Sequence, residues 1–323
     1  MANQDTRVSV CMLAYNVAPY IGEAIEGVLQ QKTDFSIELV IGEDCSTDDT
    51  RRICEAYATR YPDVVRVTPP EANLGIAGNA ARTLARCRGT YIAICDGDDV
   101  WNDPHKLQQQ VDFLEQNPDY GVVYTDVQTI SETGQPIEDE EHASIRGQYA
   151  SGAIFFKLLQ GNFINNSTAV FRSRFLLDYE IDRDRNYYTH DHLLWLYIAA
   201  QAKIHFINAP TTRYRKHTGG VTRSTAKLEN NKKKFQYHLY DILLNFDKHN
   251  RNPVSTEDRL LFFRKILSVL IRKENNAAMK LNILGLAPKY FPGMLGLTRI
   301  MFSKIGFHFF PAINENVLTT KLE

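Results

Sequence analysis

The sequence predicts an α/β fold in which a mostly parallel sheet is flanked by helices. Over the first hundred residues, short apolar runs rich in β-branched residues alternate with stretches whose apolar residues recur at helical spacing. This order is typical of βαβ units, whose strands lie parallel. The apolar runs also end in polar or acidic residues, as strands do where an open α/β sheet forms a binding crevice.

Four strands and three connecting helices are expected in this part of the chain. The strands are predicted at residues 8–14, 37–42, 64–68 and 90–95. The helices are predicted at residues 21–30, from a cap at Ser46 or Thr47 to Tyr61, and at residues 78–87. The second helix should stop at Pro62, because proline cannot continue a helix.

The alternation continues after residue 99 with longer connections. Helices are predicted at residues 104–116, 154–159 and 192–202, and strands at residues 121–127, 168–171, 204–207 and 212–216. The acidic and polar segment 131–145 contains Gly134 and Pro136, which favour turns. We therefore predict a mobile surface loop there.

After about residue 220, strand patterns give way to long segments with helical spacing. This change predicts a first domain at residues 1–223 and a C-terminal helical region at residues 224–323. Long segments of the second region have helical spacing and no strand pattern between them. Residues 280–311 mix apolar side chains with lysine and arginine, which suits a helix lying in a membrane interface. A helical cap on the first domain and a homodimer contact are the alternatives.

The composition excludes several classes of protein. The chain has 323 residues, of which 44% are hydrophobic and 23% charged, as in globular proteins. A net charge of -1 gives no general attraction for nucleic acid or an anionic membrane, so no nucleic-acid partner is expected. The five cysteines lack metal-ligand spacing, and we find no apolar signal core or membrane-spanning run. We expect a cytoplasmic protein, either soluble or peripheral on the inner face of the membrane.

Acidic residues gather directly behind the apolar strand that ends at residue 95. Asp96, Asp98 and Asp99 would be delivered by this strand to the edge of the sheet. Adjacent carboxylates repel one another and raise one another's pKa unless a cation lies among them. Mg²⁺ and Mn²⁺ bind such oxygens together with substrate phosphates, so the cluster predicts a metal and phosphate site. An Asp-Gly turn with solvated carboxylates is the alternative.

Five motifs follow one another along about residues 7–223. They are Ala14-Tyr15-Asn16, Glu43-Asp44-Cys45-Ser46-Thr47-Asp48, Asp96-Gly97-Asp98-Asp99, His190-Asp191-His192-Leu193-Leu194-Trp195 and Tyr214-Arg215-Lys216-His217. Each motif is weak alone, but in this order the chain resembles the inverting family 2 glycosyltransferases. The resemblance implies a GT-A, Rossmann-like sheet that binds a nucleotide-diphosphate sugar.

The resemblance implies a nucleotide-binding set at the strand ends, and two of the roles have a physical basis. The ring of Tyr15 can stack on a nucleobase. The carboxylate of Asp44 can accept a hydrogen bond from a base N–H. The expected nucleotide-binding residues are Ala14, Tyr15, Asn16, Asp44, Asn73, Gly75 and Asp96. A plain glycine-containing turn at residues 73–75 is the alternative for the loop.

The resemblance also implies a divalent cation, Mn²⁺ or Mg²⁺, which would neutralise the leaving diphosphate as a Lewis acid. Asp98 or Asp99 would be the direct carboxylate ligand, and both alternatives stay open. His217 would complete the coordination shell, although a lone histidine in a basic strand is usually solvated.

Asp191 stands where the family places its catalytic aspartate. Inversion needs a base that takes the proton of the acceptor hydroxyl on the face opposite the leaving group. The chain departs from the family at the preceding position, where His190 replaces a glutamate. Capping of the following helix is the other role open to Asp191. The expected acceptor-pocket residues are Trp101, His190 and Trp195, the last of which would otherwise pack in the core.

These expectations combine into metal-dependent, inverting transfer of a sugar from a nucleotide donor, expected to be UDP-linked, to an acceptor hydroxyl. The expected acceptor is a glycan or a lipid-linked glycan, as in cell-surface polysaccharide synthesis. A sugar-nucleotide nucleotidyltransferase is disfavoured, because the loop after Ala14 lacks a glycine-rich basic segment. A non-catalytic nucleotide-sugar-binding protein is disfavoured by the joint presence of the acidic cluster, Asp191 and His217.

Overall fold

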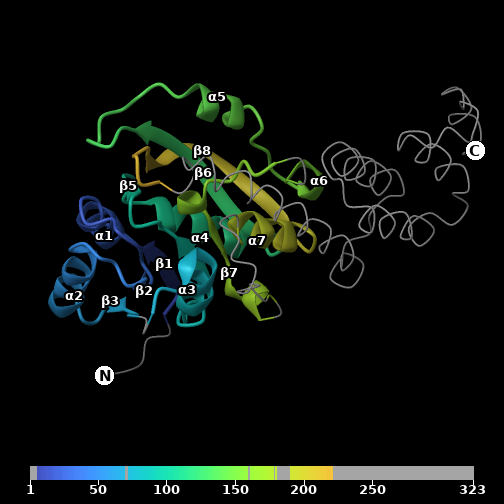
Figure 1. Ribbon diagram of the computed structural model, residues 1–323. Helices are drawn as coiled ribbons and strands as arrows, with labels where there is room; N and C mark the ends of the chain where they lie inside the picture. The colour runs from blue at the N-terminus through green and yellow to red at the C-terminus, as the bar shows by residue number, and fades with distance from the viewer. Residues whose placement is uncertain (1–5, 70–71, 159–160, 178, 180–189, 221–323) are drawn as a thin grey trace, which may run out of the picture. The chain divides into compact units, whose positions relative to one another are not determined.

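An eight-stranded sheet forms the centre of the part of the chain that the computed structural model describes (Figure 1). The described residues are 6–69, 72–158, 161–177, 179 and 190–220. The strand order is β3-β2-β1-β4-β7-β6-β8-β5. The elements are β1 (Val8–Ala14), α1 (Ile21–Leu29), β2 (Ile37–Glu43), α2 (Thr50–Arg60), β3 (Val65–Val67), α3 (Gly75–Leu84), β4 (Tyr91–Ile94), β5 (Val100–Trp101), α4 (Lys106–Gln116), β6 (Tyr120–Ile130), α5 (Glu140–Arg146), α6 (Phe155–Leu158), η1 (Asn166–Thr168), β7 (Val170–Arg172), η2 (Ser173–Leu176), α7 (His190–Ala199) and β8 (Lys203–Arg215).

The first four strands form the parallel half of the sheet. β1 pairs in parallel with β2 on one side and with β4 on the other, and β3 continues the parallel order beyond β2. The register places Ala14 beside Glu43 and Cys11 beside Ile94. The carboxyl ends of β1, β2 and β4 therefore open at one edge of the sheet, and the α/β class predicted from the sequence is confirmed.

The second half of the sheet is mixed. β7 runs antiparallel to both β4 and β6, whereas β6 and β8 run parallel to each other. The short strand β5 closes this side by pairing antiparallel with β8. The sequence does not indicate β5, and it predicts two strand pieces where β8 is one strand. β8 passes through Pro210 at an irregularity in its pairing with β6, the kind of place where a strand tolerates proline.

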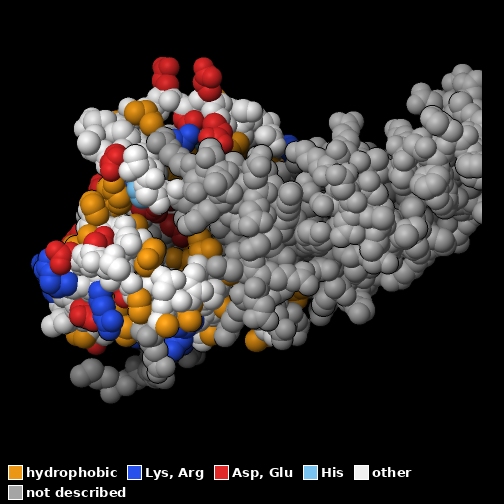
Figure 2. All heavy atoms as spheres, in the orientation of Figure 1, with side chains coloured by type: hydrophobic (Ala, Val, Ile, Leu, Met, Phe, Trp, Pro, Cys, Tyr) orange, Lys and Arg blue, Asp and Glu red, His pale blue; other side chains and the backbone are white. Residues whose placement is uncertain are grey.

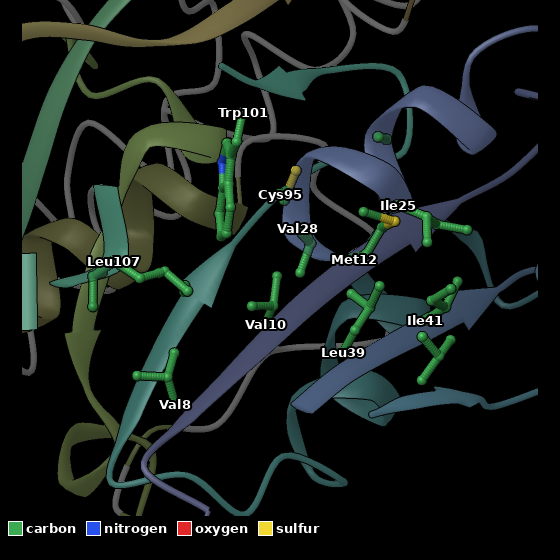
Figure 3. Packing of buried hydrophobic residues seen from close by; sticks show 14 of the residues in the cluster. Val8, Val10, Met12, Ile25, Val28, Leu39, Ile41, Cys95, Trp101 and Leu107 are labelled. Atoms are coloured by element: carbon green, nitrogen blue, oxygen red, sulfur yellow. The ribbon is translucent and has the colours of Figure 1, made fainter. Parts of the chain in front are cut away.

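Alternate residues of β1 point into the main hydrophobic core. Val8, Val10 and Met12 are completely buried and form one cluster with the apolar faces of α1, α2 and α4, as Figure 3 shows for part of the cluster. Helix α3 packs on β1 and β2 from the opposite face of the sheet. There, the side chains of Asn79 and Thr83 occupy the space that a Cβ at Gly42 would need. This packing fixes the strand ends on which the polar residues lie.

The prediction of a mobile loop at residues 131–145 is wrong for its second part, where α5 forms. The carboxylate of Asp126 on β6 accepts from His142 at 3.0 Å and from Arg146 at 2.8 Å. Lys216 also reaches Asp139, just before the helix, at 2.7 Å. Tertiary ion pairs therefore hold a helix that is too short to be stable alone.

The predicted C-terminal region lies outside the described residues. This applies to the domain boundary near residue 223, to the helical character of residues 224–323 and to the membrane-interfacial or dimerising role of residues 280–311, all of which stay predictions. Among the helices that the structure does describe, none combines the length and the apolar character that crossing a membrane requires.

Substitution of Gly97 by alanine tests this packing. A Cβ at this position would lie 2.9 Å from the carbonyl oxygen of Leu13 and 2.9 Å from the Cδ1 atom of Ile21. We expect Gly97→Ala to lower the free energy of unfolding by about 1–3 kcal/mol, because the backbone has to shift. Gly147→Ala, whose Cβ would meet only Ser144 O at 3.5 Å, is the control. Equal denaturation midpoints for the two variants would contradict the packing described.

Candidate active site

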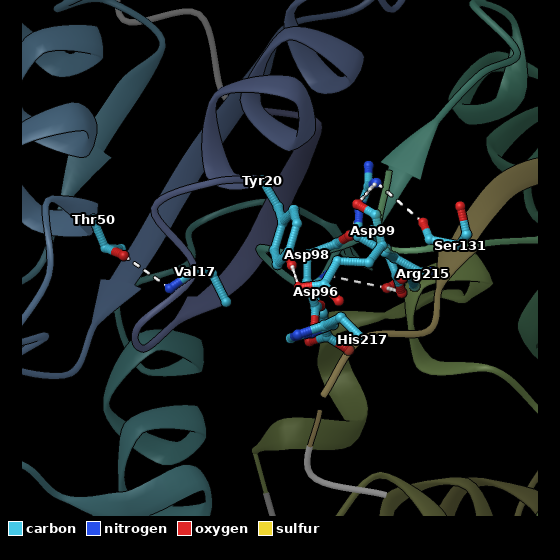
Figure 4. A network of polar contacts seen from close by, with 11 residues as sticks. Val17, Tyr20, Thr50, Asp96, Asp98, Asp99, Ser131, Arg215 and His217 are labelled. Atoms are coloured by element: carbon cyan, nitrogen blue, oxygen red, sulfur yellow. Dashed lines mark hydrogen bonds and ion pairs between the residues drawn. The ribbon is translucent and has the colours of Figure 1, made fainter. Parts of the chain in front are cut away.

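The polar residues predicted at the strand ends lie along one edge of the sheet. In Figure 4, Asp96, Asp98 and Asp99 lie together near His217 and Arg215, where β4 and β8 end. Figure 2 shows acidic side chains gathered at the bottom of a hollow on the face turned to the viewer. The site is therefore a recessed, acidic crevice.

Hydrogen bonds join the loop after β1 to the loop after β2. Asn16 adopts a left-handed backbone, with φ of 53°. Its side-chain oxygen accepts from Thr47 N at 2.8 Å, and its own N–H donates to Ser46 Oγ at 3.0 Å. The preceding residue, Tyr15, is 49% exposed, which is unusual for a residue with a large ring. An exposed ring suits stacking better than it suits core packing.

Asp44 joins the end of β2 to the loop before α3. Its N–H donates to Ala14 O at 3.0 Å, and its Oδ1 accepts from Leu74 N at 2.9 Å. The side-chain amide of Asn73 donates a hydrogen bond to the backbone oxygen of Asp44 at 2.8 Å. Gly75, the first residue of α3, has a positive φ of 69°. Burial raises the pKa of the Asp44 carboxyl. The structure thus brings together the strand ends and the loop that the sequence assigns to the nucleotide.

Arg82 is a residue of this region that the sequence analysis does not single out. One guanidinium nitrogen donates to Glu43 O at 3.0 Å and the same nitrogen contacts the side-chain oxygen of Asn79. Nε and Nη1 of Arg82 are buried without a hydrogen-bond partner among the described residues. Burial lowers the pKa of Arg82, and the charge of Asp44 opposes that shift. Arg82 lies two helical turns after Gly75, the first residue of α3, and this spacing could have indicated that both residues lie on one side of the helix.

Asp99 is turned into the protein. The residue is only 3% exposed; its Oδ2 accepts from Ser167 Oγ at 2.6 Å and its Oδ1 from Arg215 N at 3.0 Å. Burial raises the pKa of Asp99 well above its usual range, and repulsion from Asp98 and Asp96 adds to the rise. Both oxygens are thus already engaged by protein donors.

Asp98 faces His217 across the crevice. Its Oδ2 lies 2.9 Å from Nε2 of the imidazole, and its side chain is 27% exposed. The ring of Tyr20 packs against the imidazole with the ring centroids 4.8 Å apart. The guanidinium of Arg215 donates to Asp98 O at 3.1 Å and lies over the Tyr20 ring at 4.9 Å. Asp98 and His217 therefore form a supported pair in which the histidine is buried and the carboxylate remains partly exposed.

Asp96 is held by hydrogen bonds to Ser167 and Asn166. Its N–H donates to Ser167 Oγ at 3.0 Å, and its oxygens accept from the amide of Asn166 at 3.2 and 3.3 Å. Burial raises the pKa of Asp96 to about 7, and the charges of Asp98 and Asp191 add to the rise. The charges of Asp98 and Asp191 both reach Asp96, which indicates that the three carboxylates belong to one region of the molecule.

Asp191 occupies the first turn of α7 and is partly exposed. Its Oδ2 accepts from Asn162 Nδ2 at 2.8 Å. The oxygen of the same amide accepts from Ile164 N at 3.1 Å, which fixes the orientation of the amide. The sequence analysis does not single out Asn162, because nothing in the chain links two residues so far apart.

The three residues predicted for the acceptor pocket have different surroundings. Trp101 is 3% exposed, and its indole N–H donates to Ser167 O at 2.7 Å. Trp195 is completely buried and packs edge-on against Phe171 with the ring centroids 5.7 Å apart, which agrees with the core alternative. His190 is the first residue of α7, and its side chain lies outside the described part of the structure. The acceptor-pocket roles stay predictions.

A divalent cation fits this set of donors only together with a substrate. Within the residues that the structure describes, no three His, Cys, Asp or Glu side chains are already grouped as a metal site. Asp98 and His217 offer one carboxylate and one imidazole. Mg²⁺ commonly uses one or two carboxylates and takes its other ligands from substrate phosphates and water. The pair therefore fits a metal that arrives with a diphosphate.

The strand order and the helices that flank the sheet define an α/β protein of the GT-A class. Residues 9–182, more than half of the chain, match the sequence model of glycosyl transferase family 2, and the chain belongs to this family. An uncharacterized protein of Mycobacterium tuberculosis is 34% identical over 217 residues, which cover 67% of this chain and 61% of the relative. An uncharacterized glycosyltransferase of Nostoc is 36% identical over 118 residues, 36% of each chain. The chain thus spans less than two thirds of the length of these relatives.

Solved structures share the fold. TarS of S. aureus (residues 1–349), in complex with UDP-GlcNAc, has a TM-score of 0.59 at 18% identity, over 88% of this chain and 78% of TarS. The mannosyltransferase PcManGT of Pyrobaculum calidifontis, in complex with GDP-Man and Mn²⁺, has a TM-score of 0.55 at 17% identity, over 94% of this chain and 86% of PcManGT. At such identities the likeness shows the fold alone, and it confirms the GT-A fold predicted from the sequence. The predicted family is confirmed by the match to the sequence model.

The raised pKa of Asp96 generates a prediction for stability. A folded-state pKa of about 7 lies above the unfolded value of about 3.9, so the neutral carboxyl stabilises the fold at low pH and this contribution is lost as the pH rises through 7. In chelator, Asp96→Asn should lack this loss. Its free energy of unfolding relative to wild type should rise by about 2 kcal/mol between pH 5 and pH 7.5. A constant difference in urea denaturation would contradict the proposed cause.

Proposed function

We propose that this chain transfers a sugar from a nucleotide-diphosphate donor, a UDP-sugar, to a hydroxyl of a glycan acceptor with inversion at the anomeric carbon. The observation that carries the proposal is the grouping of acidic side chains at the carboxyl edge of the sheet. Asp98 lies 2.9 Å from His217, and the charges of Asp98 and of Asp191 both contribute to the raised pKa of Asp96. In the proposal, Asp98 and His217 face the donor diphosphate, and Asp191 faces the attacking hydroxyl.

The donor nucleotide would bind at the ends of β1 and β2. Tyr15 offers an exposed ring for stacking on the base, and Asp44, anchored through Leu74 N, offers an acceptor for a base N–H. TarS is known in complex with UDP and UDP-GlcNAc, and PcManGT with GDP-Man. Titration with UDP-sugars and GDP-sugars in parallel tests the choice of uridine; preferential binding of a GDP-sugar would overturn it.

We assign the direct carboxylate contact with the metal to Asp98 and not to Asp99. The reason is that both oxygens of Asp99 already accept from Ser167 and Arg215. Asp98 and His217 would hold Mn²⁺ or Mg²⁺, as the Mn²⁺ bound to PcManGT also suggests. The ion, when bound, would neutralise the negative charge that develops on the leaving diphosphate.

The general base in this proposal is Asp191. Its carboxylate would take the proton from the acceptor hydroxyl while the oxygen of that hydroxyl attacks the anomeric carbon. Asn162 donates to one carboxylate oxygen of Asp191 and so restrains the orientation of the carboxylate. The chain lacks the glutamate that family members carry before this aspartate. The Asn162 amide is therefore the described neighbour that orients the base.

Asp191→Asn separates catalysis from binding. The amide cannot accept the proton, so we expect kcat to fall by about 10²–10⁴-fold while the Kd for UDP changes little. UDP release in the presence of glycan acceptors measures the first quantity and titration calorimetry the second. Asp112→Asn, on the exposed face of α4, is the matched control. Normal turnover by Asp191→Asn would show that another group is the base.

The pair Asp98→Asn and Asp99→Asn tests the metal assignment. Asp98→Asn should raise the Mn²⁺ concentration for half-maximal activity by about 10-fold or more, because a ligand is lost. Asp99→Asn should change it far less, since an asparagine oxygen can still accept from Arg215 N. EDTA should stop UDP release by the wild type, and Mn²⁺ or Mg²⁺ should restore it. Full activity in EDTA would remove the metal from the proposal.

A further inference from the structure

Lys106 is a completely buried lysine that the proposed reaction does not use. It is the first residue of α4 and has no exposed surface. Burial lowers the pKa of Lys106 to about 7. The positive end of the helix dipole also disfavours a cation in the first turn. Within the described ranges, no carboxylate lies at ion-pair distance from its ammonium group, so a simple salt bridge does not explain the residue.

The ammonium group of Lys106 is instead satisfied by three neutral partners. Nζ donates to Gln110 Oε1 at 2.6 Å and to Thr168 O at 3.1 Å. It also lies 4.5 Å from the centre of the Trp101 ring, within the range of a cation–π contact. Gln110 in turn donates to Thr168 O and to Val123 O, both at 2.9 Å. All of these side chains are buried, so their geometry is fixed by packing.

The turn that these donors hold is the same turn that contacts the carboxylates. Thr168 is the last residue of η1, and Ser167 precedes it. Trp101 donates its indole N–H to Ser167 O, opposite the hydroxyl that donates to Asp99. The hydroxyl also accepts from the N–H of Asp96. Buried side chains therefore donate hydrogen bonds to the carbonyl groups of the η1 turn. The serine hydroxyl of the same turn contacts the acidic cluster.

We propose that Lys106 is a positioning residue of the donor site. By holding Thr168 O, its ammonium keeps Ser167 in the place where the serine hydroxyl fixes both Asp96 and Asp99, without touching the donor itself. This inference rests on the proposed function, because it gives the fixed carboxylates a role in binding a nucleotide sugar with its metal.

Substitution of Lys106 by methionine tests the inference, because methionine keeps an unbranched apolar stem and removes the ammonium group. In the full-length chain, Lys106→Met should raise the KM for the UDP-sugar, and the Kd for UDP with Mn²⁺, by about 10-fold. The matched control is Val111→Ala, a buried residue of the same helix that belongs to the main core. It should lower the melting temperature while leaving the Kd within about twofold. Equal Kd values for both variants at a similar loss of melting temperature would overturn the inference.

A double substitution tests the route through Ser167. Ser167→Ala alone should weaken binding of the nucleotide sugar, because the hydroxyl no longer holds the backbone N–H of Asp96 and the carboxylate of Asp99. Adding Lys106→Met to this variant should then have less than about a twofold further effect, since both changes act through one contact. Effects that multiply would show that Lys106 does not act through the serine.

Hydrogen exchange provides a measurement that does not require a bound nucleotide sugar. The N–H of Asp96 donates to Ser167 Oγ, so amide exchange in the segment 96–101 should accelerate in Lys106→Met and not in Val111→Ala. Unchanged exchange in this segment would contradict the positioning role. If the wild type binds no UDP-sugar in the presence of Mn²⁺, the proposed function fails, and the exchange rates still decide whether Lys106 fixes the cluster.

Discussion

Repulsion between carboxylates is the constraint on which the rest of this site depends. Strand β4 ends in three aspartates within four positions, and the fold separates their environments. Asp99 turns inward to Ser167 Oγ and to the N–H of Arg215, whereas Asp98 and Asp96 remain in the hollow. Asp99 thus becomes part of the framework, Asp96 accepts from the amide of Asn166, and Asp98 remains partly exposed beside His217. Without the hydrogen bonds from Ser167 and Arg215 to Asp99, three negative charges would repel one another at the end of β4.

Arg215 connects this arrangement to the rest of the fold. Its guanidinium, almost completely buried, donates to Asp98 O, to the carbonyls of residues 131 and 132 and, at 2.6 Å, to Glu23 on α1. One side chain therefore ties the end of β8 to α1, to the segment before α5 and to the acidic turn. Because His217 lies two residues farther along, these contacts also determine where its imidazole meets Asp98.

The sequence predicts what depends on local pattern and on parallel strand order. The strand ends at Ala14 and Asp44 meet because parallel strands share an edge, and this was predictable from apolar runs followed by polar residues. The different roles of Asp98 and Asp99 were not predictable from the sequence. The hydroxyl that donates to Asp99 belongs to Ser167, which lies far away in the chain and carries no motif. Helix α5 was missed for a similar reason: its acidic, turn-rich sequence favours a loop, and ion pairs with Asp126 hold the helix.

The proposed reaction requires one nucleotide sugar to bind between the end of β4 and the first turn of α7. A crystal structure of the full chain with Mn²⁺ and a non-hydrolysable UDP-sugar measures this most directly. We expect the ion within about 2.5 Å of a carboxylate oxygen of Asp98, bridged to the diphosphate, with the anomeric carbon turned toward Asp191. A diphosphate bound elsewhere, or a sugar with Asp191 and the metal on the same side, would contradict the account.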